Sequence, residues 1–310
     1  MTSERKLEGT TAAPACSRVP RSRSWAVEAE KRLLLLLFLL LATACISEER
    51  EQEIGNTMAA EVNPHLPLVE DPLLQAYVSS IGGNLAEVSE RPDLDYRFYI
   101  INTDIVNAFA LPGGHVYLTR GLIERTEDGA EFAGVLAHEI GHVAARHGVQ
   151  KLQRHLRTGS LVNVLYNTIL GGEPTLLREN SLQLANLLWS AQHSRSDEEE
   201  ADRLAVRYLL RAGAAPEGII TLLQKLLEEE EEADSSSIGP METLFSTHPL
   251  TAARIVDAQE NIERLTGEEA QLQELDLEAF QAFKVLVARA AGNGTDEATG
   301  EMVGEGEEAS

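Results

Sequence analysis

The chain has 310 residues, of which 43% are hydrophobic and 25% charged, so it can bury one sizeable core. Acidic residues outnumber basic ones by 50 to 26, which argues against a nucleic acid as partner because phosphates attract positive charge. Both cysteines, Cys16 and Cys45, lie near the N-terminus, so a metal site in the body of the protein would use histidine and carboxylate ligands.

The first predicted element is a targeting segment. Lys31 and Arg32 precede nine consecutive Leu and Phe residues, a run shorter than the roughly 20 that span a bilayer, so a signal peptide over 1–44 is favoured over a membrane helix. The Ala-Thr-Ala-Cys sequence that ends at Cys45 resembles a bacterial lipobox. We therefore expect an exported protein on the periplasmic face of a bacterial membrane, favouring an outer-membrane lipoprotein that is held by lipid at Cys45 through a tether over 45–59.

The rest of the chain predicts one α+β, mainly helical domain over 60–291. Apolar residues recur at helical spacing over 69–89. Short β-rich runs follow and predict a small antiparallel sheet, over 96–101, 106–111 and 115–118. Further helices are expected over 131–146, 150–170, 181–212, 216–229, 251–266 and 275–291. The acidic residues 292–310 have almost no apolar side chains and are predicted to be disordered.

The helix over 131–146 carries the pattern His138-Glu139-Ile140-Gly141-His142. Histidines at i and i+4 are offset by only about 40° around a helix, so both rings can reach one ion. Glu139 is poorly placed to be a ligand but close enough to take a proton from a water molecule on that ion. A chance pairing of histidines is the alternative. It is disfavoured because the flanking residues are apolar, and burying these side chains without a shared task is costly.

A third metal ligand would have to come from another helix. Glu198 and Asp202 share a helix face at i and i+4, so one can bind the metal while the other accepts a hydrogen bond from a ligand histidine. The alternative is an ordinary acidic helix start, favoured by the helix dipole. The other histidines, at 65, 115, 147, 155 and 193, have no partner at metal-ligand spacing and are predicted to be surface or structural residues.

Four blocks in order make the chain resemble the gluzincin metallopeptidases. This group includes the CAAX prenyl protease, HtpX, the mitochondrial Oma proteases and the periplasmic proteases BepA and LoiP, and the chain is most similar to the BepA and LoiP type. The blocks are Asn107 to Gly114 with Val116 to Leu122, His138 to His142, Ser194 to Asp202, and Thr247-His248-Pro249 with Arg254. The resemblance covers about residues 60–260. It implies a zincin fold with one zinc ion per subunit, Glu198 as third ligand and Asp202 as its supporting partner.

The resemblance also implies how a substrate binds. The strand near Asn107 would pair with substrate backbone through Asn107, Ala108, Phe109, Ala110, Gly113 and Gly114; an ordinary hairpin turn is the alternative. Arg254 would stabilise the substrate oxyanion. His248 would approach the metal from the substrate side, and the alternative for it is an exposed histidine at a helix start.

The sequence as a whole favours a zinc-dependent endopeptidase that cleaves misfolded or stalled cell-envelope proteins. Its expected partners are such proteins and the membrane. One rival is an envelope chaperone or assembly factor that uses the same cleft with proteolysis normally switched off. A second rival is a zinc hydrolase acting on small amides or peptidoglycan, for which an edge strand would have no obvious use.

Overall fold

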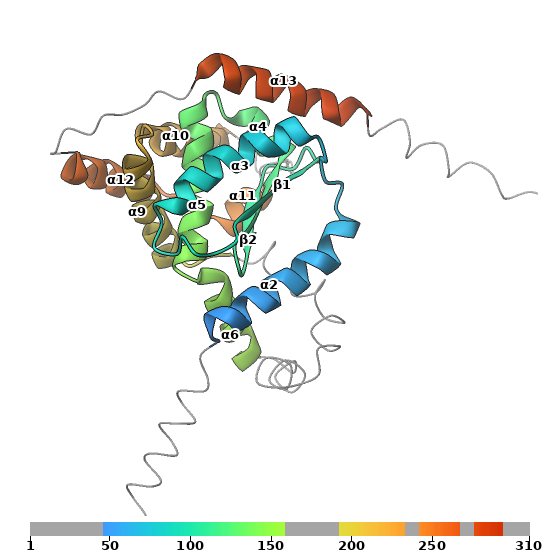
Figure 1. The fold of residues 1–310 in the computed structure, drawn as a ribbon. Helices are drawn as coiled ribbons and strands as arrows, with labels where there is room; N and C mark the ends of the chain where they lie inside the picture. The colour runs from blue at the N-terminus through green and yellow to red at the C-terminus, as the bar shows by residue number, and fades with distance from the viewer. Residues whose placement is uncertain (1–45, 159–191, 233–241, 267–275, 294–310) are drawn as a thin grey trace, which may run out of the picture. The chain divides into compact units, whose positions relative to one another are not determined.

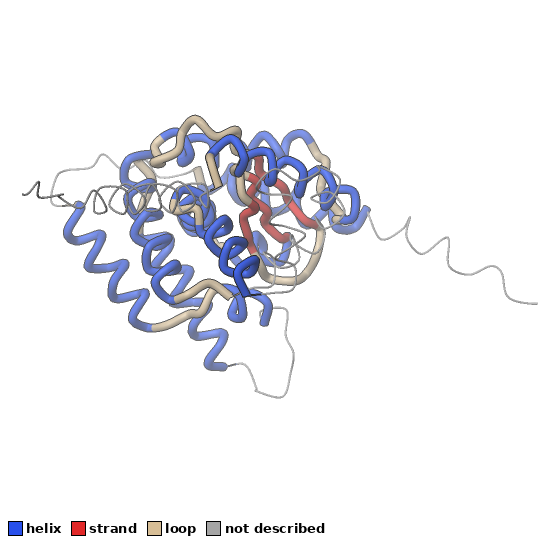
Figure 2. Tube along the Cα trace, turned by 90° about the horizontal axis from the view of Figure 1, so that it is seen from below, coloured by secondary structure: helices blue, strands red, loops and turns tan. Residues whose placement is uncertain are grey.

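The computed structural model describes residues 46–158, 192–232, 242–266 and 276–293. These residues are mainly helical around one small sheet (Figures 1 and 2), which confirms the predicted class. No helix in this part of the chain is long and apolar enough to cross a membrane. The predicted signal peptide and Cys45 lie outside the described residues.

The described elements follow the predicted order with additions. The helices are α2 (Glu48–Val62), the 3-10 helix η1 (Asn63–His65), α3 (Pro72–Glu87), α4 (Arg120–Arg125), α5 (Gly129–Ala144), α6 (His147–Thr158), α9 (Arg195–Ala212), α10 (Glu217–Glu232), α11 (Glu242–Thr247), α12 (Ala252–Leu265) and α13 (Leu277–Asn293). The strands are β1 (Arg97–Ile101), β2 (Ala108–Leu111) and β3 (His115–Thr119). The expected helices over 150–170 and 181–212 and the expected tail over 292–310 lie partly outside the described residues.

The sheet has the strand order β1-β3-β2, so β3 is central. β2 pairs with β3 in antiparallel fashion through a tight turn, as expected. β1 pairs with β3 in parallel, so the prediction of a purely antiparallel sheet is wrong. The chain crosses from β1 to the far side of β3 before it enters β2, which leaves β2 at an edge.

Both faces of the sheet are covered by helices. On one face, Phe98, Ile100, Val116 and Leu118 join the main core with α3 and α5. On the other face, three aromatic rings form a row across the strands, with centroids 4.6 Å apart between Tyr99 and Tyr117 and between Tyr117 and Phe109. This second face belongs to a separate cluster, with Ile54 and Met58 of α2 among its members.

The polar tether expected over 45–59 is therefore wrong for residues 48–59, which belong to α2. Buried Glu51 anchors this helix: its carboxylate lies 2.8 Å from Nη1 of Arg91 and 2.8 Å from Nε of Arg146. Gly55 faces the hairpin turn so closely that a Cβ there would lie 1.8 Å from the carbonyl oxygen of Pro112. A helix fitted this tightly is part of the domain.

Candidate metal centre

The site rests on the close packing of α5 against α9. A Cβ atom at Gly141 of α5 would lie 2.9 Å from the carbonyl oxygen of Ala201 in α9, an approach that only glycine allows. Both helices begin with a side-chain cap, Asp128 for α5 and Ser194, in a capping box, for α9. Side chains of one helix therefore reach those of the other over a short, fixed distance.

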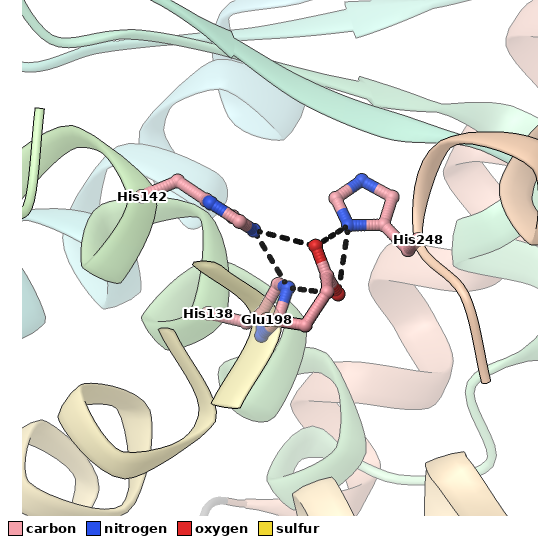
Figure 3. Close-up of side chains that lie close together, drawn as sticks. All are labelled: His138, His142, Glu198 and His248. Atoms are coloured by element: carbon pink, nitrogen blue, oxygen red, sulfur yellow. Dashed lines mark hydrogen bonds and ion pairs between the residues drawn. The ribbon is translucent and has the colours of Figure 1, made fainter. Parts of the chain in front are cut away.

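Three ligand atoms from these helices converge on one point (Figure 3). Nε2 of His138 lies 3.0 Å from Nε2 of His142, and the two Glu198 oxygens lie 3.3 Å from His142 Nε2 and 3.5 Å from His138 Nε2. Atoms bound tetrahedrally to zinc at about 2.0–2.1 Å are about 3.4 Å apart, so these spacings fit one ion. Two histidines and a carboxylate are a donor set typical of catalytic zinc sites.

The charges around this point suit a cation. Burial raises the pKa of the Glu198 carboxyl, but His248, His138 and His142 outweigh it and hold that pKa well below its usual range. Glu198 is thus an anion at neutral pH. Nδ1 of His138 lies 2.9 Å from Oδ1 of Asp202, so the carboxylate can fix the ring with Nε2 facing the other ligands.

Glu139 lies beside the converging atoms on the same helix. Its side chain is buried, and burial raises the pKa of its carboxyl, an effect that His248 and His138 partly offset. One carboxylate oxygen lies 3.8 Å from Nε2 of His248. A buried carboxyl with a raised pKa at this position is suited to accept and return a proton near neutral pH.

His248 is the fourth group of the cluster. It directly follows α11, and it offers a ligand atom within 4.8 Å of those of His138, His142 and Glu198. Its Nδ1 lies 3.1 Å from Glu198, and its Nε2 lies 3.4 Å from the carbonyl oxygen of Ala108 in β2. The ring therefore occupies the space between the ligand carboxylate and the edge strand, and Figure 3 shows it turned toward Glu198. It is buried rather than an exposed histidine at a helix start.

Each nitrogen of the Arg254 guanidinium contacts a neighbouring oxygen. Its Nε and Nη2 donate to Asp202 at 2.7 and 2.8 Å, and its Nη1 lies 2.8 Å from Glu198 and donates to the Pro249 carbonyl at 3.0 Å. Both carboxylates are buried with it. This arrangement orients Asp202 and Glu198, and the oxyanion role that the resemblance implies stays a prediction; Arg254 also lines the cavity that contains Glu139 and His248.

The strand expected to bind substrate, β2, lies next to this cluster. β2 is at the edge of the sheet, and Ala110 lies with Glu139 and His142 on the wall of one cavity. Phe109 points to the opposite face, into the aromatic row. Buried Asn107 accepts a hydrogen bond from Thr247 at 3.3 Å, which links the strand to the His248 segment.

Gly113 and Gly114 do not lie at an open strand end. Their φ angles of 79° and 96° suit the tight turn between β2 and β3, a conformation that glycine adopts without strain. Both are buried, Gly113 against the backbone of Gln52 in α2 and Gly114 against Tyr96. The structure thus gives both glycines a part in the turn, and their contact with substrate stays a prediction.

Two small cavities border Glu139. One has Ala110, His142 and Val143 among its lining residues. The other lies beside His138 and His248, and most of its wall is aliphatic, from Leu122, Val135, Ile219, Leu222, Leu223, Leu226, Leu244 and Leu250. Apolar side chains therefore border the centre next to His248.

Two histidines that the sequence does not link to the metal lie against it. Nδ1 of buried His147 lies 2.8 Å from Nδ1 of His142. The ring of His193 lies 4.1 Å from that of His142, and its backbone N–H donates to Thr247 at 2.9 Å. Burial lowers the pKa of His193, which keeps this ring neutral. Neither residue has helical spacing to a predicted ligand, so spacing could not reveal them.

Comparisons with known proteins agree with this geometry. The model of peptidase family M48 matches residues 72–262. The chain is 32% identical over 226 residues to the beta-barrel assembly-enhancing protease of Yersinia pestis, covering 70% of this chain and 45% of that protein. It is 33% identical over 164 residues to the mitochondrial metalloendopeptidase OMA1 of Arabidopsis thaliana, covering 53% of this chain and 31% of that protein. It is 30% identical over 181 residues to the metalloprotease LoiP of Escherichia coli strain K12, covering 58% of this chain and 66% of that protein. The chain spans about half the length of the assembly-enhancing proteases that it matches.

Proposed function

Because the chain belongs to peptidase family M48, a family of metalloproteases, we propose that it is a zinc-dependent endopeptidase with one zinc ion per subunit. The observation that carries the proposal is the convergence of His138, His142 and Glu198 beside a buried Glu139. The edge strand β2, whose Ala110 lines a cavity together with Glu139, supports an endopeptidase, since an extended chain can pair with an edge strand at any point along its length.

His138, His142 and Glu198 would hold the zinc ion. When bound, the ion would act as a Lewis acid that polarises the scissile carbonyl and lowers the pKa of a water molecule. Glu139 would accept a proton from the attacking water and return it to the leaving amine, a role that its raised pKa suits. Asp202 would hold the ring of His138, and Arg254 would hold both Asp202 and Glu198.

The substrate would add a strand to the edge of the sheet at β2. This part of the proposal rests on the position of β2 as an edge strand beside the cluster and on the carbonyl of Ala108, which points toward His248. Pairing through main-chain groups tolerates many sequences and requires an extended chain. Asn107, Ala108, Phe109 and Ala110 would form this edge, and unfolded segments would be the preferred substrates.

We further propose misfolded or stalled cell-envelope proteins as the physiological substrates. Support comes from the predicted export of the chain and from the name of the beta-barrel assembly-enhancing proteases that it resembles. The protein would be held at the periplasmic face of a bacterial membrane, as an outer-membrane lipoprotein, by lipid at Cys45.

The proposed anchor predicts the mature N-terminus. Mass spectrometry of the membrane fraction is expected to find a chain that begins at an acylated Cys45. Replacing Cys45 by serine should move the protein to the soluble fraction, while the same change at Cys16 should have no effect. An unmodified N-terminus at another residue would contradict the anchor but not the chemistry.

Casein cleavage tests the proposed activity. Because casein lacks a stable fold and can enter an edge strand, the purified protein is expected to cut it internally in the presence of zinc. Removal of zinc with a chelator should abolish cleavage, and added zinc should restore it. Absence of cleavage by the zinc-loaded protein, with casein still bound, would favour the rival function of a chaperone or assembly factor.

One observation supports that rival in part. His248 is buried between Glu198 and the carbonyl of Ala108, in the space that a substrate would need. If this arrangement keeps proteolysis switched off, His248→Ala is expected to raise the initial rate of casein cleavage, with the exposed His65→Ala as control. Equal rates in the wild type and in His248→Ala would exclude the closed state as a brake on activity.

A further inference from the structure

His147 reaches His142 only because the helix is interrupted between them. On a continuous helix, a residue five positions further along lies about 140° around the axis and faces away. Here α5 ends at Ala144, Arg146 adopts a φ of 60°, and α6 begins at His147. A positive φ is unfavourable for arginine, and such strained positions cluster at functional sites.

Arg146 is held in this conformation from outside the helix. Its Nε lies 2.8 Å from buried Glu51 of α2, and its Nη2 donates to the carbonyl of Ile46 at 2.6 Å. These two contacts stabilise the break between α5 and α6. Because of the break, His147, with 1% of its surface exposed, places Nδ1 at 2.8 Å from Nδ1 of His142.

The contacts of His147 match the tautomer that His142 needs in order to bind a metal ion. Nε2 of His147 lies 3.3 Å from the Glu200 carboxylate and 3.9 Å from that of Asp197, and an ionised carboxylate can only accept. An imidazole that binds a metal ion through Nε2 carries its proton on Nδ1. Metal binding through the Nε2 lone pair of His142 would therefore direct its Nδ1–H at Nδ1 of His147, which can accept it while Nε2 of His147 donates to the carboxylate.

That lone pair is the one directed at the metal position. Figure 3 shows Nε2 of His142 turned toward Glu198, with the other ring nitrogen pointing away from the cluster. His138 has the same arrangement with a different partner, since its Nδ1 lies 2.9 Å from Asp202. Each histidine of the pair therefore has a polar side chain within 3 Å of its Nδ1.

We propose that His147, held by Glu200, is a positioning residue that keeps His142 in the tautomer and orientation required to bind the metal ion. The inference rests on the proposed metal site but concerns a residue outside it. Partners behind a ligand histidine fix its ring and strengthen it as a ligand, and their loss typically weakens metal binding about 10- to 100-fold.

Two substitutions at His147 separate this role from simple packing. Asparagine and leucine have nearly the same size, but only asparagine keeps an acceptor near the position of Nδ1. We expect His147→Leu to bind zinc about 10- to 100-fold more weakly than the wild type in competition with a chromophoric chelator. His147→Asn is expected to recover most of that loss, although both variants should have similar melting temperatures without metal.

Nitrogen-15 NMR of the zinc-free protein, labelled at histidine, provides a readout independent of activity. In the wild type and in His147→Asn, His142 should show the signals of a ring protonated at Nδ1. In His147→Leu these signals should shift toward a mixture of tautomers. Equal zinc affinity and equal His142 spectra in the asparagine and leucine variants would overturn the proposal.

If the variants at His147 do not fold, Glu200 gives a milder test. Glu200→Ala removes the acceptor for His147 and should weaken zinc binding about two- to tenfold, the range for one hydrogen bond. Glu199→Ala, at the neighbouring exposed position, makes the same change in charge without this contact and should bind zinc like the wild type. Equal affinities for the two variants would contradict the role of His147. A wild type that binds no zinc would instead overturn the metal site itself.

Discussion

Glu198→Ala is expected to lose its zinc ion, whereas Glu139→Gln is expected to keep zinc and lose activity. Glu198 would provide the ligand oxygen beside the two histidines and is completely buried, and it is the one carboxylate among the described residues that belongs to the cluster. Glu139 holds no ligand position in this arrangement, and its loss removes a proton acceptor, worth about 10²- to 10⁴-fold in rate. Metal analysis of both purified variants and their casein cleavage rates provide the measurements.

Retention of zinc by Glu198→Ala would contradict the expected result and would point to another ligand. His248 offers a ligand atom to the same cluster, so zinc retained in Glu198→Ala would identify His248 as able to complete the site in place of the carboxylate. The double variant Glu198→Ala with His248→Ala should then lose the ion. Glu199→Gln serves as the control, because it changes charge on the same helix without contact to the ligands, and it should keep both zinc and activity.

Local spacing was sufficient to predict the part of the site that lies on single helices. His138 and His142 share one face of α5, and Glu198 and Asp202 share one face of α9, because residues four apart on a helix are neighbours. That the two faces meet depends on Gly141, whose backbone approaches Ala201. No local pattern contains this contact: spacing made the Glu198 segment a candidate source of the third ligand, and the resemblance to known proteases supported that choice.

The features that prediction missed depend on contacts between distant segments. α2 resembles a polar spacer because Glu48, Glu49 and Glu51 open it, yet Glu51 is buried by Arg91 and Arg146. The parallel pairing of β1 depends on a chain crossing that strand composition does not encode. The approach of His147 to His142 follows from one backbone angle at Arg146, which depends on α2.

Two roles are open to Arg254, and replacing it distinguishes them. The resemblance implies that it stabilises an oxyanion, whereas its contacts here are with Asp202 and Glu198, both buried. Arg254→Met keeps much of the side-chain volume but leaves two buried carboxylates without their cationic partner. Breaking a buried ion pair from one side costs about 3–5 kcal/mol, so we expect a loss of this size in the free energy of unfolding of the zinc-free protein.

Urea unfolding of the zinc-free variants measures this loss. Arg264→Met is the matched control, because Arg264 lies on the same helix and is exposed, so its replacement should change stability by no more than about 0.5 kcal/mol. Asp202→Asn combined with Arg254→Met should cost less than the sum of the single changes, since the residues share one interaction. If Arg254→Met keeps wild-type stability and zinc affinity but loses most of its cleavage rate, the guanidinium must leave Asp202 during the reaction and act on the substrate. A lower stability with weakened zinc binding would instead assign to Arg254 the task of holding the ligand carboxylate in place.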